Sequence, residues 1–191
     1  MNVHSIVLYV HIVGALGLFV ALGLEWTALA RLRGAATAEE ARGALGALAP
    51  TRVIGPLSLA AILVAGLYLT ATSVGWQGWN VSSLAAMVVI AALGAAANAS
   101  RMPALGRSIG PLRGPLDVAL RARLRDPLLW SSIQVRVAIA LGIVLLMTAK
   151  PDVVGAIVTL VAFAVAGAVA AFATSRASAT SLEPRGLGSA S

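Results

Sequence analysis

The sequence predicts an all-α fold, a polytopic transmembrane bundle of five helices with the N-terminus outside and the C-terminus cytoplasmic. Of the 191 residues, 59% are apolar and only 11% are charged, and the mean hydropathy is +0.92. A soluble domain is about half apolar and about a quarter charged. Five stretches are long enough to cross a bilayer, which takes roughly 20 mostly apolar residues. Basic residues fall almost entirely in alternate connections between these stretches.

The five spans are predicted along residues 6–30, 53–72, 81–99, 128–149 and 153–174. Pro56 lies in the first turn of the second span, where proline is tolerated. Asp126 followed by Pro127 is a favourable start for the fourth span, with an acidic cap and proline at the first helical position. Residues 1–174 should therefore form one five-span transmembrane domain. Residues 175–191 lack periodicity and predict a flexible cytoplasmic tail.

Two connections contain signals for short helices. Thr37 and Glu40 have the spacing of a capping box, which predicts a helix running through Leu48 and ending at Pro50. In the third connection, residues 117–125 follow an amphipathic basic pattern with leucines at positions 116, 120 and 124. This pattern is typical of a helix lying on the inner leaflet, with Arg121, Arg123 and Arg125 as lipid-facing basic residues. The alternative is a connector whose arginines only set the topology.

The basic residues indicate the orientation. Thirteen of the fourteen are arginine, and all thirteen belong to the first connection, the third connection with the start of span four, or the tail. Only Lys150 lies in the remaining connections. Because cytoplasmic connections retain Lys and Arg, the net charge of +7 indicates sidedness rather than nucleic-acid binding. The partners expected are the lipid bilayer and anionic lipids on the cytoplasmic side. The arginine bias indicates a GC-rich bacterial genome, and the expected location is the bacterial inner membrane.

Composition also excludes several chemistries. The chain has no cysteine, so disulfides, thiolate metal sites and cysteine nucleophiles are absent. It has two histidines, His4 and His11, too few for a multi-histidine metal site within one chain. There is no phosphate loop, dinucleotide fingerprint or paired-histidine protease motif. A nucleophile with its base and orienting group is not visible either, so the chain is more typical of a non-enzyme.

Two opposite charges are predicted at matching depth within the spans. Glu25 and Arg136 each lie about 9 Å from the inner boundary at ~1.5 Å per helical residue. Charges inside a membrane are costly and usually pair. We expect an intramembrane ion pair between spans one and four, with Asn98 near it. The pair would either hold helices together or form part of a proton or ligand relay.

His11, Met87 and Met147 are the candidate ligand or metal residues, because all three are predicted in the outer half of the membrane. Imidazole and thioether suit Cu(I). Alternatively, the two methionines fill gaps in the core, and His11 forms a hydrogen bond with a neighbouring helix. Haem or copper are the cofactors to consider.

The segments YVHIVGALG (residues 9–17) and Val135–Pro151 resemble small uncharacterised bacterial integral membrane proteins, loosely similar to copper-resistance D-type membrane domains. The resemblance implies that His11 is the family histidine, and that Arg136 and Lys150 with Pro151 are later landmarks. It also implies copper or haem handling. The tryptophan often found shortly after that histidine is absent, and the further histidines of a copper or haem protein are missing.

Three functions remain open from the sequence. The first is a non-enzymatic membrane protein that binds a small ligand, an ion or a partner. The second is a haem- or copper-handling protein that uses His11. The third is an oligomeric transporter or channel subunit, which would require a homo-oligomer.

Overall fold

The computed structural model of the protein describes residues 2–180, without the side chains of residues 98–100 and 177–180. Within this range the fold is all-helical and has no β-strand, as predicted. Its elements in chain order are α1 (Val3–Gly34), α2 (Ala38–Gly46), α3 (Thr51–Leu69), the π-helical turn η1 (Thr70–Val74), α4 (Gly78–Ile109), α5 (Val118–Leu124), α6 (Pro127–Ala149) and α7 (Val153–Thr180).

The five predicted spans correspond to α1, α3, α4, α6 and α7. Together with their short neighbouring helices, these are long and apolar enough to cross a membrane. Three helices extend beyond the predicted C-terminal ends of their spans: α1 continues to Gly34, α4 continues through Pro103 to Ile109, and α7 continues to Thr180. Apolar composition marks the part of a helix that lies in lipid, whereas backbone hydrogen bonds carry the helix further. Residues 181–191 of the predicted tail lie outside the described residues.

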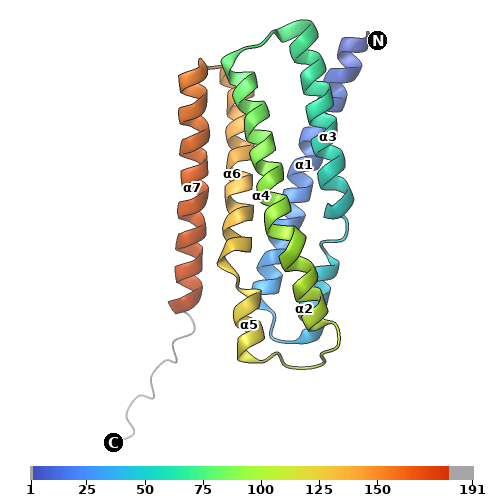
Figure 1. The fold of residues 1–191 in the computed structure, drawn as a ribbon, viewed down its shortest axis with the longest axis vertical. Helices are drawn as coiled ribbons and strands as arrows, with labels where there is room; N and C mark the ends of the chain where they lie inside the picture. The colour runs from blue at the N-terminus through green and yellow to red at the C-terminus, as the bar shows by residue number, and fades with distance from the viewer. Residues whose placement is uncertain (1, 181–191) are drawn as a thin grey trace, which may run out of the picture.

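The long helices run up and down and form an elongated bundle (Figure 1). Helix α1 packs against α3 and α6, α4 packs against α6, and α7 covers α6 and α4 from outside. Helices α3 and α4 are consecutive long helices that make little contact with each other. Many large apolar side chains are exposed on the long helices, such as Val64 at 71% and Leu57 at 68%. Such surfaces suit contact with lipid chains.

Helices α2 and α5 lie together at one end of the bundle, and the N-terminus lies at the other (Figure 1). We call the end with α2 and α5 the arginine end. It carries the arginines of the first and third connections, which are residues 31, 33, 42, 52, 101, 107, 113, 121, 123 and 125. The charge pattern in the sequence thus corresponds to one end of the folded molecule.

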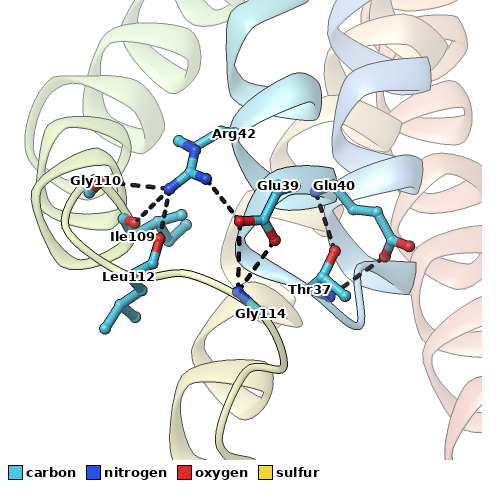
Figure 2. Close-up of polar contacts among 8 residues, drawn as sticks. All are labelled: Thr37, Glu39, Glu40, Arg42, Ile109, Gly110, Leu112 and Gly114. Carbon is cyan, nitrogen blue, oxygen red and sulfur yellow. Dashed lines mark hydrogen bonds and ion pairs between the residues drawn. The ribbon is translucent and has the colours of Figure 1, made fainter.

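The predicted capping box starts α2 (Figure 2). The Glu40 backbone amide donates to Thr37 Oγ1 at 3.3 Å, and Glu40 Oε2 accepts from the amides of Ala36 at 2.7 Å and Thr37 at 3.4 Å. Helix α2 itself ends at Gly46, and a turn fills residues 47–50 before α3. The capping prediction is confirmed, and the predicted end at Leu48 was two residues too far.

Glu39 and Arg42 attach α2 to the connection between α4 and α5 (Figure 2). Arg42 donates to the Leu112 carbonyl at 2.6 Å and to Glu39 Oε1 at 3.0 Å, and the Gly114 amide donates to Glu39 Oε2 at 3.2 Å. The pKa of Glu39 is lowered, first by its own backbone amide, and then by the Gly114 amide and Arg42. Because the pKa of Glu39 is lowered, its carboxylate is charged at every pH above the usual pKa of glutamate, and the attachment is fully present there. The attachment weakens only when the pH falls through the lowered pKa.

Glycine permits two close helix contacts. A Cβ atom on Gly14 would lie 3.1 Å from side-chain atoms of Ala61 and Ile62 on α3. A Cβ atom on Gly167 would lie 2.9 Å from Ala138 Cβ and from the Gln134 carbonyl oxygen on α6. In a membrane, where lipid chains are as apolar as leucine, such close backbone approach is a main source of helix association.

We predict that Gly167→Ala weakens the packing of α7 on α6. The added methyl group meets backbone atoms that cannot rotate away, so it should cost about 1–3 kcal/mol of stability. The measurement is thermal unfolding of the detergent-purified protein. Gly23→Ala is the matched control, because no atom lies within 4 Å of its added Cβ. Equal stability of the two variants would contradict the close contact.

Candidate functional site

A cavity of about 530 Å³ lies between α1, α3, α4 and α6. It occupies the half of the bundle away from the arginine end, where α1 and α4 begin and α6 ends. Several of its large apolar lining side chains are exposed, most of all Leu16 and Ile12 on α1 and Val144 on α6. Its volume falls within the range of about 300–1,000 Å³ typical of sites for small molecules.

His11 lies in the wall of this cavity, on α1. Its Nδ1 is 3.2 Å from the Ile62 carbonyl oxygen on α3. The ring packs beside Gly66, where an added Cβ would lie 3.2 Å from His11 Cε1 and 3.4 Å from Nδ1. The absence of a side chain at Gly66 therefore makes room for the imidazole against α3.

Met87 on α4 and Met147 on α6 line the same cavity. The structure thus brings the three candidate ligand residues to the walls of one cavity, from three different helices. Met87 is buried and Met147 is half-buried. Among the described residues there is no cluster of three or more His, Asp or Glu side chains that could hold a metal ion. Any metal at this site would therefore depend on the imidazole and the thioethers.

Asn80 and Ser83 also line the cavity, and the sequence did not single them out. Their polar atoms are engaged with the backbone: Ser83 Oγ donates to the Trp79 carbonyl at 2.8 Å, and Asn80 Nδ2 donates to the Gly75 carbonyl at 2.7 Å. The spacing from Asn80 through Ser83 to Met87 is three and then four residues, which places all three on one helix face. That periodicity is the signal that could have identified this wall.

The structure pairs Glu25 with Arg136, as the matching depths led us to expect. Arg136 Nη1 donates to Glu25 Oε2 at 3.0 Å, and Nη2 donates to Glu25 Oε1 at 2.5 Å. Glu25 is 7% exposed and Arg136 is 5% exposed. This two-pronged geometry is the strongest form of an arginine–carboxylate contact. It joins α1 to α6 inside the bundle.

Helix α4 accommodates the pair through another glycine. A Cβ atom on Gly94 would lie 3.0 Å from Arg136 Nη1, so the guanidinium lies directly over the α4 backbone. The side chain of Asn98, which we expected nearby, lies outside the described side chains. Neither Glu25 nor Arg136 lines the cavity. The pair lies between packed helices. This position supports the alternative in which the pair holds the helices together.

The three lipid-facing candidates lie on or beside α5. Leu116, Leu120 and Leu124 are buried in the hydrophobic core, so the apolar face of this helix packs on protein. Arg121 Nη2 donates to the Ala36 carbonyl at 3.3 Å, and Arg125 Nε donates to the Arg33 carbonyl at 3.3 Å. Arg123 is exposed. Any contact of α5 with the leaflet would therefore have to come from its arginines.

Comparisons of the chain with models of protein families, with curated proteins and with solved structures give no match. The class of the molecule rests on its fold. Five long apolar helices make it a multi-pass membrane protein, with one ion pair buried between two spans and one apolar cavity in the half of the bundle away from the arginine end.

We predict that Glu25→Gln destabilises the protein by about 3–5 kcal/mol, because it leaves the buried Arg136 charge without its counter-charge. The single variant Arg136→Glu should be at least as unstable. The exchange of both residues, Glu25→Arg with Arg136→Glu, should recover most of the loss. Unfolding temperature and yield in detergent measure all three variants. A stable Glu25→Gln protein would show that the pair contributes little.

Proposed function

We propose that the protein is a non-enzymatic membrane protein that binds a small, mainly apolar molecule in the cavity between α1, α3, α4 and α6. The observation that carries this proposal is the cavity itself, with its volume of about 530 Å³ and its apolar lining, part of which is exposed on α1 and α6. Apolar lining that is exposed on the spans suits a ligand that arrives from the lipid phase. The proposal corresponds to the first of the three functions that the sequence left open.

The orientation belongs to the same proposal. Cytoplasmic connections of membrane proteins are enriched in Lys and Arg, so the arginine end would face the cytoplasm of a bacterial cell, with anionic lipid headgroups as its partners. The N-terminus would then be outside, and the cavity would lie in the outer half of the inner membrane. Assembly into a homo-oligomer, and with it the transporter or channel function, stays a prediction.

Tryptophan fluorescence offers a direct test, because Trp79 lines the cavity. A bromonaphthalene that carries a methyl group (the methyl probe) should quench Trp79 saturably in lipid nanodiscs, since bromine quenches tryptophan on contact. Trp79→Phe should remove this saturable component. Quenching that rises only linearly with the probe, as for simple partition into lipid, would overturn the proposed function.

We predict that Ile12→Trp weakens saturable binding of the methyl probe at least about tenfold, because Ile12 lines the cavity and the larger ring would fill part of it. Val13→Trp is the matched control. Val13 is the next residue of α1 and is 46% exposed, against 50% for Ile12, but it does not line the cavity. Equal loss in both variants would indicate a general effect of tryptophan on α1.

A second candidate function is haem or copper handling at His11. It is favoured by one observation, the convergence of His11, Met87 and Met147 on the same cavity. Neutral imidazole and thioether sulfur are suitable ligands for Cu(I). Of these three, His11 would supply the nitrogen and the methionines would supply soft sulfur ligands.

The measurement for this candidate is the absorption spectrum and the copper content of the purified protein. If the candidate is correct, a Soret band or one equivalent of copper is present and is lost in His11→Ala. Met87→Leu should weaken retention of copper and leave the fold intact, because the two side chains have similar volumes. A colourless, copper-free protein after purification with added haem or Cu(I) would contradict it.

A further inference from the structure

The His11 imidazole has one nitrogen that the protein uses and one that it does not. Nδ1 contacts the Ile62 carbonyl at 3.2 Å. Among the described residues, none forms a hydrogen bond with Nε2. The Nδ1–Cε1 edge of the ring faces α3 at Ile62 and Gly66, so Nε2 and Cδ2 lie on the edge away from that contact.

The Ile62 contact determines the tautomer. A carbonyl oxygen only accepts hydrogen bonds, so the proton of a neutral imidazole lies on Nδ1. Nε2 then carries a lone pair and can only accept. The imidazole thus offers the cavity one hydrogen-bond acceptor that no described residue engages.

Three other polar side chains in the cavity wall already use donors within their own segment. Asn80, Ser83 and Thr148 donate to backbone carbonyls there. No Arg, Lys, Asp or Glu side chain is among the described residues that line the cavity. A ligand with a charged head would therefore find no counter-charge there, and burying that charge would be costly.

We propose that the ligand is an uncharged apolar molecule with one hydroxyl or phenol group, and that this group donates a hydrogen bond to His11 Nε2. This inference rests on the proposed function and specifies its ligand class. A soft metal ion could take the same lone pair. The cavity favours the larger occupant, because a single ion would leave most of the roughly 530 Å³ unfilled.

Gly66 acts here as a positioning residue. With alanine at this position, the added methyl would lie 3.2 Å from His11 Cε1, which is closer than ordinary van der Waals contact. The ring would have to shift by a few tenths of an ångström, and this shift would strain its contact with the Ile62 carbonyl. The direction of the Nε2 lone pair would then change.

The test compares two probes that differ in one group. The hydroxyl probe is the bromonaphthol in which a hydroxyl replaces the methyl of the methyl probe. The ratio of their affinities, measured by Trp79 quenching, should be about fivefold higher for the wild-type protein than for His11→Phe, from the value of one net hydrogen bond. Comparing ratios between proteins cancels the different partition of the probes into lipid.

Each outcome decides a different claim. Binding of both probes with the same ratio in wild-type and His11→Phe would overturn the hydroxyl inference and leave the proposed function standing. Binding of neither probe would overturn the proposed function. Retained binding of the methyl probe by His11→Phe shows that this variant folds and keeps its cavity.

Nitrogen-15 NMR of histidine provides a second readout that does not depend on affinity. The chain has two histidines, and His4→Ala assigns their signals. Free wild-type protein should show His11 protonated on Nδ1, and the hydroxyl probe should shift the Nε2 signal in the direction of hydrogen bonding, whereas the methyl probe should not. Gly66→Ala should reduce this shift. A proton on Nε2 in the free protein, or equal shifts with both probes, would overturn the inference.

Discussion

The ion pair between Glu25 and Arg136 is the interaction on which the arrangement of the bundle depends. Both charges are buried between helices, and their two hydrogen bonds require α1 and α6 to meet in one register and rotation. His11 on α1 and Met147 on α6 line the cavity from these same two helices. The pair lies about 21 Å along α1 from His11, at ~1.5 Å per residue. A polar contact near the arginine end thereby positions the walls of an apolar space near the other end.

The hydrophobic core runs through both halves of the bundle, and it includes the leucines of α5 near the arginine end and residues of the cavity wall such as Ile62 and Met87. Helices α3 and α4 make little contact with each other, and the space between α1, α3, α4 and α6 remains open as the cavity. Glycines permit close contacts elsewhere, as at Gly14 and Gly167. Gly66 differs, because its missing side chain makes room for a ring that faces a cavity.

Much of the fold could be predicted, and part of the site. Local rules predicted three features that the structure contains. They are the five long apolar helices, the cap formed by Thr37 and Glu40, and the helix start at Asp126 and Pro127. Glu25 and Arg136 could be predicted as a pair, because they lie at equal depth in the predicted spans and few other charges occur there. The direction of the leucines at 120 and 124 could not be predicted, because an amphipathic face suits a lipid surface or a protein core equally well. The same holds for Asn80 and Ser83, whose role depends on which neighbour their helix face meets.

By itself, the sequence determined that this chain is a multi-spanning helical membrane protein with its arginines gathered at one end. Those properties follow from composition and local periodicity, which need no knowledge of neighbours. Only the tertiary structure decided that His11, Met87 and Met147 share a cavity, and that the His11 imidazole is held by the Ile62 carbonyl. The reason is that a helix can present any of its faces to any neighbour. Which faces meet is set by close-packed glycines and by the buried Glu25–Arg136 ion pair, which are contacts between residues far apart in the chain.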